Sequence, residues 1–338
     1  MEMKKLDIRY LIVCSLFLLL TLPFNVMAQD GAGDAEDPYA PVTGIPEGYK
    51  LIEEDILVRI NEPEGTFDNN QWSNKRVPYT FHSNVNQTNR NRAIAAMNEI
   101  EAISDTAVDF RPRNGESNYV RFVSHATSNN SQVGMKGGRQ DINIVSWSSK
   151  FIIVHECLHA LGFWHEQSRP DRDSFVTIHF SRVQDGKSHN FDKKSSADVY
   201  GQYDFDSVMH YGQCAFSKNS PCSSSTRTIT VKSPNTSKQS AIGQRSKLSD
   251  LDKLTVTMLY PPSSWRFVNG SYSKAPPASG FSFFQLGTFF LPTKTISKGV
   301  SVVPTGGTLI IQPGTYNGNG TYNKKMTFKA PLGGVTLN

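Results

Sequence analysis

The stretch HECLHALGFWHEQSRPDRD, which begins at His155, constrains the fold of this chain most. Residues four apart on an α-helix share a face, so His155 and His159 can bind one metal ion. Many helices end at a residue in the left-handed conformation, which glycine adopts easily, so we expect the helix to end at Gly162. The chain can then turn back and bring His165 to the same point. Three imidazoles and one open position are typical of a catalytic zinc site with one ion per chain. Glu156, beside the first ligand, can reach a zinc-bound water as general base.

A lone H-E-x-x-H motif occurs by chance in many helices, but here Gly162 and His165 follow at the required offsets. Met209 then follows downstream in the sequence SVMHY. Two core histidines on an amphipathic helix would leave these matches unexplained. The full pattern is typical of metzincin zinc proteases. Together with AIGQRSKLSDLDKLTVTMLY at residues 241–260, it makes the chain resemble the astacin family over roughly residues 72–260.

The resemblance implies an α+β fold of the metzincin type, with a mixed sheet, a backing helix, an active-site helix and a cleft between two subdomains. It also implies a zinc-dependent endopeptidase with protein or peptide substrates. The resemblance makes His155, His159 and His165 the zinc ligands and Glu156 the general base. It places Met209 in the turn that packs beneath the metal. Tyr211 becomes a mobile ligand that stabilises the transition state, and Glu166 becomes the partner of the mature amino terminus.

Three of these roles have competing interpretations. Met209 can be an ordinary core methionine, and Tyr211 can merely fill the wall of the cleft. Glu166 can form an ion pair with Arg169 or Arg172 on the following turn. In the family, the amino terminus that meets this glutamate is created by activation, and the resemblance places it near residues 62–66.

Alternation of apolar and polar residues predicts strands at residues 76–81, 119–124 and 141–147, and helical spacing predicts an amphipathic helix at 88–106. The sequence SQVGMKGGRQ at 131–140 corresponds in order to the family's sheet edge above the cleft. We therefore expect an extended substrate to pair with its main chain. An ordinary Gly-rich hairpin is the competing interpretation. The residues of this expected edge strand are Ser131, Gln132, Val133, Gly134 and Met135.

Residues 1–28 are typical of a secretory signal peptide, because three basic residues precede an apolar run at 10–22 that is too short for a membrane anchor. We expect a secreted, extracellular protein, or a periplasmic one if the source is bacterial, without stable membrane insertion. Cys214 and Cys222 flank a short polar loop and are consistent with a disulfide, which fits an oxidising compartment. Cys157 faces away from the helix histidines and is expected to be a buried free thiol.

An acidic stretch follows the signal peptide. Residues 29–71 contain eleven acidic side chains against Lys50 and Arg59, whereas the whole chain carries a net charge of +5. We interpret residues 29–64 as a prosegment that docks on a basic body and inhibits it, although a solvated acidic linker is an alternative. IEEDIL at 52–57 is similar to the F-E-G-D-I element of astacin prosegments. That resemblance makes Asp55 the zymogen switch ligand on the zinc, with Glu54 standing where the family has glycine.

The paired prolines after Tyr260 separate the expected catalytic domain, residues 65–260, from a small β-rich C-terminal module, residues 261–338. Within the module, GGTLIIQPGTYN and KKMTFKAPLGGVTL are similar to one rung of a right-handed parallel β-helix. The module can pack on the catalytic domain, contact an extracellular surface or glycan through residues 265–338, or be a remnant of a longer structure. No nucleic-acid partner is expected.

The sequence thus predicts a secreted zinc endopeptidase made as a latent zymogen. A function of another class is also conceivable, namely a non-catalytic secreted binding protein that uses the C-terminal module on a zinc scaffold. Glu156 discriminates between them, because a scaffold needs the histidines but not that carboxylate.

Overall fold

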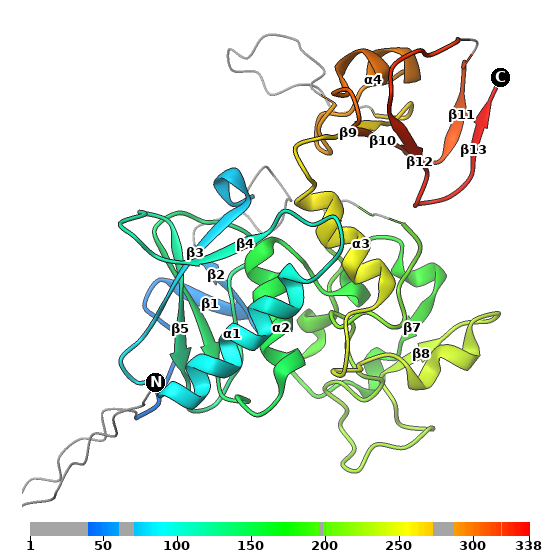
Figure 1. Ribbon diagram of the computed structural model, residues 1–338. Coiled ribbons are helices and arrows are strands. Elements are labelled where there is room, and N and C mark those ends of the chain that lie inside the picture. Colours follow the sequence, from blue (N-terminus) through cyan, green and yellow to red (C-terminus); the bar gives the residue numbers. More distant parts are fainter. Residues whose placement is uncertain (1–39, 61–70, 196–198, 200, 273–286, 319) are drawn as a thin grey trace, which may run out of the picture. The chain divides into compact units, whose positions relative to one another are not determined.

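The computed structural model describes residues 40–60, 71–195, 199, 201–272, 287–318 and 320–338 (Figure 1). The expected signal peptide, the start of the prosegment and the expected mature amino terminus near residues 62–66 lie outside the described residues.

A four-stranded sheet forms the first part of the catalytic region, in the order β4-β3-β5-β6, and every neighbouring pair is parallel. The antiparallel component of the expected mixed sheet is the single bridge between Asn130 and Asn143 beside β6. The predicted strands at 76–81 and 119–124 are confirmed, whereas the third begins at Arg139 and ends at Ile144. The strands are β3 (Arg76–Phe81), β4 (Asp109–Pro112), β5 (Tyr119–Ser124) and β6 (Arg139–Ile144).

Two helices pack together against this sheet, α1 (Gln87–Glu101) and α2 (Lys150–Leu161) (Figure 1). The side chain of Asn86 caps α1 by accepting a hydrogen bond from the Asn89 N–H at 3.0 Å. The helix buries an apolar stripe on one face. It ends at Glu101, five residues before the expected end at Thr106, because the chain turns back there. The Glu101 carboxylate then accepts a hydrogen bond from the Phe110 N–H at 2.6 Å. The buried stripe consists of Ala93, Ala96, Met97 and Ile100.

The second part of the catalytic region has little regular structure and its own apolar cluster, which includes Val176, Phe191, Tyr203, Tyr211 and Ile229. The antiparallel pair β7 (Val176–Ile178) and β8 (Ile229–Val231) lies here, followed by helix α3 (Asp250–Leu259). Short 3-10 turns connect the rest: η1 (Ser73–Lys75), η2 (Glu166–Ser168), η3 (Arg172–Ser174), η4 (Phe180–Arg182), η5 (Ser188–Phe191) and η6 (Thr236–Ser240).

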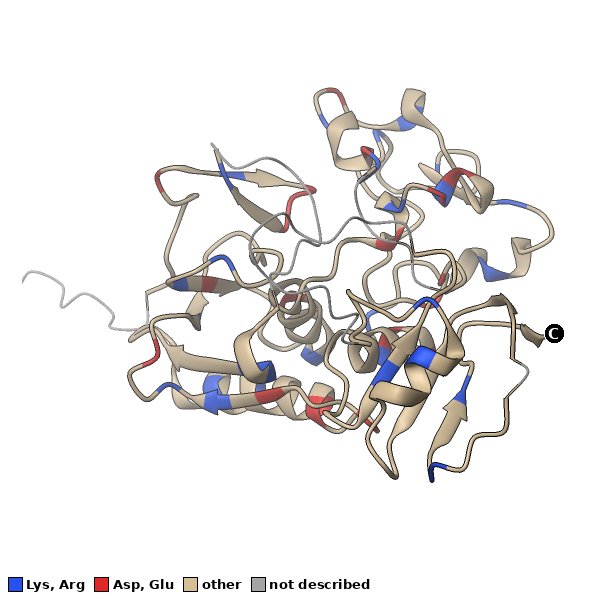
Figure 2. Cartoon of the chain, turned by 90° about the horizontal axis from the view of Figure 1, so that it is seen from above, with Lys and Arg blue, Asp and Glu red and all other residues tan. Residues whose placement is uncertain are grey.

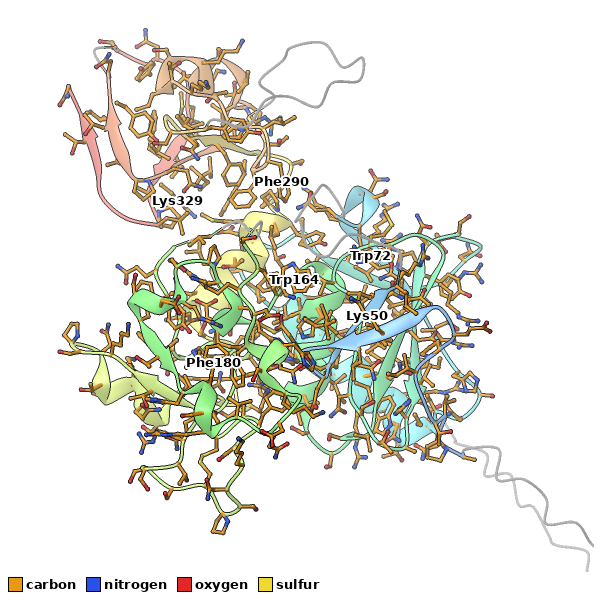
Figure 3. All side chains as sticks on the ribbon, turned by 180° about the vertical axis from the view of Figure 1, so that it is seen from behind. Lys50, Trp72, Trp164, Phe180, Phe290 and Lys329 are labelled. Carbon is orange, nitrogen blue, oxygen red and sulfur yellow. A yellow bond between two sulfur atoms is a disulfide. The ribbon has the colours of Figure 1, made fainter. Side chains whose placement is uncertain are left out.

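The described part of the segment expected to be a prosegment contains a β-hairpin, with β1 (Tyr49–Ile52) paired to β2 (Ile56–Arg59). Figure 3 shows the hairpin from behind, with Lys50 on its ribbon. Its three-residue loop has Glu53 and Glu54 in left-handed backbone conformations, with φ of 52° and 64°. Glycine adopts this conformation without steric cost, which fits the glycine that the similar F-E-G-D-I element has at the position of Glu54.

The C-terminal module, described by itself, is built from parallel strands. A three-stranded sheet has the order β12-β10-β9, and β11 pairs with β13. The two matched sequences therefore form two stacked turns of chain rather than the single rung expected, because strands of the first pair with strands of the second. The elements are β9 (Trp265–Val268), α4 (Ile296–Val302), β10 (Thr308–Ile311), β11 (Gly314–Tyr316), β12 (Thr327–Lys329) and β13 (Val335–Leu337).

Acidic and basic side chains are interspersed over the elements rather than gathered by sign (Figure 2). Among the described residues, none of the helices has the length and apolar character needed to cross a membrane.

Candidate metal centre and catalytic cleft

Helix α2 presents His155, Glu156 and His159, and all three side chains are buried. The helix ends at Gly162, whose φ of 114° is the left-handed conformation expected there. The reversal places the Phe163 carbonyl where His159 Nδ1 donates to it at 2.7 Å. The glycine therefore ends the helix and also allows the following chain to support a ligand.

The three predicted zinc ligands converge. His155 Nε2 lies 3.1 Å from His159 Nε2 and 3.3 Å from His165 Nε2. Nitrogens about 2.0–2.1 Å from a tetrahedral zinc ion are about 3.4 Å apart, close to these separations. One carboxylate, Asp55, completes a group whose ligand atoms all lie within 4.8 Å of one another. The residues therefore fit a zinc ion, and the described residues contain this one such group.

The outer nitrogen of each imidazole faces an oxygen acceptor. His155 Nδ1 lies 2.9 Å from the Val208 carbonyl, and His165 Nδ1 lies 2.5 Å from Glu53 Oε2. With the Phe163 carbonyl on the third ring, every Nδ1 can hold the proton while Nε2 keeps its lone pair for the metal. Burial lowers the pKa of His155 to about 4 and lowers that of His159 well below its ordinary value, which favours the neutral imidazole that a metal needs.

Glu156 is a buried carboxylate directly beside the metal ligands. Burial raises its pKa well above the ordinary value, and the charge of Asp55 raises it further. Its Oε2 atom has no hydrogen-bond partner among the described residues. A buried and unpartnered carboxylate is costly for folding alone, so this residue is a candidate for chemistry rather than for stability.

The turn at residues 207–209 supports the first ligand from below. The Val208 carbonyl accepts from His155, and the N–H of the same residue donates to Asp252 Oδ2 at 2.9 Å. Asp252 also accepts from the Ser207 hydroxyl at 2.7 Å and closes a capping box with Ser249 at the start of α3. The apolar side chain of Met209 is buried in the same core as α2. A helix cap distant in sequence thus positions the turn that holds His155.

Tyr211 lies against the third ligand, with its ring centroid 4.6 Å from that of His165. Its N–H donates to Gln167 Oε1 at 3.0 Å, and its hydroxyl donates to the carbonyl of Glu53 at the tip of the hairpin. Burial raises the pKa of Tyr211 well above its ordinary value, so the hydroxyl stays protonated and can donate. The backbone of Gly243 packs against the backbone of Tyr211 and Gly212. No side chain fits at Gly243, because an added Cβ would lie 2.2 Å from the Gly212 Cα.

The β1–β2 hairpin places Asp55 among the three imidazoles. Asp55 Oδ2 lies 3.1 Å from His165 Nε2 and 3.3 Å from His155 Nε2. Burial alone would raise the pKa of Asp55, but the facing imidazoles outweigh it and hold the pKa below its usual range. The same facing carboxylate overcomes the effect of burial on His165 and raises its pKa to about 9.

The expected edge strand, residues 131–135, is not a regular strand, and its one isolated bridge joins Ser131 to Ile56. The Ser131 N–H donates to the Asp55 carbonyl at 2.9 Å, and the Leu57 N–H donates to the Ser131 carbonyl at 2.8 Å. Val133 packs with Ile52 and Ile56 of the hairpin. The main chain of Ser131, expected to bind substrate, therefore pairs with the hairpin, and in the parallel sense.

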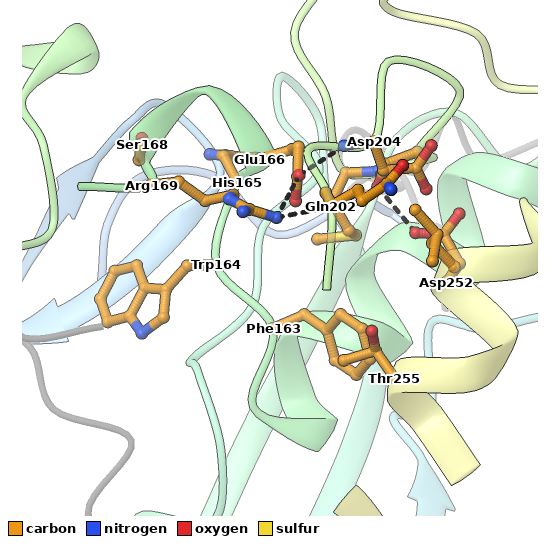
Figure 4. Close-up of a pocket in the computed structure, with 13 residues that line it drawn as sticks. Phe163, Trp164, His165, Glu166, Ser168, Arg169, Gln202, Asp204, Asp252 and Thr255 are labelled. Carbon is orange, nitrogen blue, oxygen red and sulfur yellow. Dashed lines mark hydrogen bonds and ion pairs between the residues drawn. The ribbon is translucent and has the colours of Figure 1, made fainter. Parts of the chain in front are cut away.

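Glu166 lines a small cavity of about 70 Å³ beside the third ligand (Figure 4). Its Oε1 accepts from Arg169 Nη1 at 2.9 Å and from the Asp204 N–H at 2.8 Å. Burial raises the pKa of Glu166 to about 7, although the Arg169 charge opposes this shift. Arg169, the competing partner considered above, therefore pairs with Glu166 here, whereas Arg172 bonds to main-chain carbonyls and Asp173.

Two residues of the site, Glu53 and Lys194, escaped the sequence analysis. Glu53 lies at the tip of the hairpin with its side chain fully buried, and Lys194 Nζ lies 3.2 Å from its Oε1. The sequence does carry one signal for the first, because it is two residues before Asp55 in the prosegment element. No local pattern marks the lysine, since it is brought in by a loop.

The cysteines lie as expected. Cys214 and Cys222 form a disulfide, and Cys157 is a buried free thiol in the core behind α2. Burial raises the pKa of the Cys157 thiol, so it stays protonated and inert.

Comparisons with known proteins agree with this geometry. The sequence profile of the astacins, a family of peptidases, matches residues 65–261. Meprin A subunit beta of Mus musculus is 33% identical over 218 residues, which are 63% of this chain and 30% of that protein. Zinc metalloproteinase nas-13 of Caenorhabditis elegans is 38% identical over 195 residues, 56% of this chain and 41% of that protein. This chain thus spans less than half the length of these relatives.

Among solved structures, high choriolytic enzyme 1, a hatching enzyme zinc-protease from Oryzias latipes, matches with a TM-score of 0.50 and 34% identity. The match covers 56% of this chain and 92% of that one. The predicted α+β metzincin fold is confirmed by this likeness. With the profile covering more than half of the sequence and the three histidines converging as in a zinc site, this chain belongs to the astacin family of peptidases.

Proposed function

We propose that this chain is a zinc-dependent endopeptidase that hydrolyses peptide bonds of proteins and is made as a latent precursor. The observation that carries the proposal is the convergence of His155, His159 and His165 beside the unpartnered carboxylate of Glu156. When bound, zinc supplies a Lewis acid that polarises a peptide carbonyl and makes a water molecule acidic. Glu156 would take the proton of that water and pass it to the leaving amine.

The neighbouring groups have supporting roles in the proposal. The Tyr211 hydroxyl would donate to the oxyanion that develops on the substrate carbonyl, once the Glu53 carbonyl has left it. The main chain at Ser131 would pair with the extended substrate after the hairpin departs. Met209 would act through packing alone.

Latency and export are further parts of the proposal. Asp55 would act as the switch residue, because it lies where the fourth ligand of a zinc ion would be and its own chain holds it at high effective concentration. The signal-like residues 1–28 and the Cys214–Cys222 disulfide support export into an oxidising compartment.

The test compares the activated wild-type protein with Glu156→Gln on a proteome-derived peptide mixture, with zinc content measured on both. We expect equal zinc and a loss of hydrolysis of at least about 100-fold in the variant, because the ligands survive and only proton transfer is removed. Wild-type turnover in the variant would show that the assigned base is wrong. A zinc-loaded wild type that cleaves none of the peptides would instead favour the non-catalytic binding protein.

A further inference from the structure

The carboxylate of Glu53 is held in a site of its own on the far side of His165 from Asp55. Its Oε2 lies 2.5 Å from His165 Nδ1 and accepts from the Ser168 hydroxyl at 3.0 Å. Its Oε1 forms an ion pair with the buried ammonium of Lys194 at 3.2 Å, and the two groups are not aligned for a hydrogen bond. The prosegment thus brackets one imidazole with two carboxylates, Asp55 on the metal-facing nitrogen and Glu53 on the outer one.

The adjacent residue provides a natural comparison. Glu54 pairs with Lys187 at the surface, where the two side chains are 43% and 41% exposed. The side chains of Glu53 and Lys194 are 0% and 8% exposed. An exposed ion pair contributes little to stability, whereas removing one partner of a buried pair leaves an uncompensated charge and is strongly destabilising. The two neighbouring pairs are therefore expected to differ greatly in their effect on docking.

The backbone at the same residue adds a further contact, because the Glu53 carbonyl accepts from Tyr211. Neither the contacts of the Glu53 carboxylate nor the hydrogen bond from Tyr211 to the Glu53 carbonyl involves the metal-facing nitrogens of the imidazoles. They would persist if the carboxylate of Asp55 were removed.

We infer that Glu53 and Lys194 form a second anchor of the prosegment, separate from the metal-facing Asp55. This anchor keeps the hairpin in the cleft even when the carboxylate of Asp55 no longer occupies the position that faces the metal. The inference rests on the proposed function only in that the cleft is taken to be the one that binds substrate. On this view Asp55 controls the metal, while the Glu53–Lys194 pair controls access to the cleft and to Tyr211.

The experiment measures release of the hairpin in the full-length, zinc-loaded precursor. Trypsin cuts after Lys50, inside β1, only when the strand opens, so the cutting rate reports the open population. All variants carry Glu156→Gln to prevent self-processing. Cutting after Lys253 in α3 serves as an internal measure of global unfolding.

We expect Glu53→Gln and Lys194→Met each to speed cutting after Lys50 by at least about 10-fold, with the double variant no faster than the faster single one, because the two groups act as a pair. Lys194→Arg should restore the slow rate. The matched surface variants Glu54→Gln and Lys187→Met should change it by less than about threefold.

Three outcomes would overturn the inference: a Glu53→Gln rate within twofold of the parent, effects of Glu53 and Lys194 that multiply, or equal acceleration after Lys50 and Lys253. None of these readouts requires peptidase activity. Failure of the second anchor is therefore distinguishable from failure of the proposed function, which is decided by the Glu156→Gln comparison on peptides.

Discussion

At the scale of single residues, the site contains several carboxylates whose surroundings assign them different tasks. Glu156 is buried and unpartnered, Asp55 faces the imidazoles, and Glu53 pairs with a buried lysine. All three are acidic residues within one small region, yet only the partners of each one separate a candidate base from a candidate inhibitor and an anchor. Residue type alone could not have made this distinction.

Replacement of Asp55 by alanine should leave the precursor partly active before any cleavage, because water can then occupy the fourth position. We expect hydrolysis well above that of the wild-type precursor but at least about 10-fold below that of the activated enzyme, since the hairpin still pairs with Ser131 and Tyr211. The measurement is peptide hydrolysis by full-length protein whose intact length is verified by mass spectrometry. A fully latent Asp55→Ala precursor with a protein ligand still on the metal would place the switch at another residue.

At the scale of elements, helix α3 shows how a cap can serve a distant site. Its N-terminal Asp252 accepts from the helix cap and from the turn that holds His155. The sequence SDLDKL has a serine and an acidic residue three positions apart, and Ser249 and Asp252 form a capping box there. The contact with the turn at residues 207–209 depends on tertiary packing and is invisible in the local sequence.

The pH dependence of stability should reveal this buried carboxylate. Burial raises the pKa of Asp252 to about 6 from 3.8, so the folded state binds its proton more tightly than the unfolded state. The contribution of Asp252 to the free energy of unfolding must therefore fall as pH rises from about 4 to 6, by at most about 3 kcal/mol. Urea unfolding at several pH values should show a flatter profile for Asp252→Asn in that window. Parallel profiles of wild type and variant would contradict the shift.

At the scale of the whole molecule, activation is expected to rearrange charge around Glu166. In the structure this carboxylate pairs with Arg169 beside a small cavity, while the hairpin occupies the cleft. The catalytic region is anchored at Trp72, whose Nε1 donates to the Ala160 carbonyl at 2.8 Å (Figure 3). A terminus six residues earlier could move up to about 20 Å from that anchor, which allows a released α-amino group to travel inward.

We therefore predict that trimming or extending the mature terminus by a few residues lowers the melting temperature, because a buried carboxylate is costly without a nearby cation. Glu166→Gln should abolish this dependence on the terminus. Thermal unfolding of a set of terminal variants, each with and without the Glu166 change, makes the measurement. Equal stability across all wild-type termini would show that Arg169 remains the partner after activation.

Much of the site could be predicted from the sequence because it rests on short-range geometry. The spacing of His155 and His159 follows from the helical repeat, and the reversal at Gly162 follows from a conformation that glycine favours. The disulfide between Cys214 and Cys222 joins residues eight positions apart, so one short loop is enough to bring its partners together. These features need no knowledge of distant contacts.

Only the tertiary structure decided which groups face those ligands. The Val208 carbonyl on His155, the Glu53 carboxylate on His165 and the buried Lys194 come from segments far apart in sequence. The same is true of the parallel pairing between the hairpin and Ser131, and of the two stacked turns in the C-terminal module. The physical reason is that a motif specifies its own backbone geometry, whereas the partner of a buried polar group is chosen by whichever distant segment the packing brings within hydrogen-bond distance.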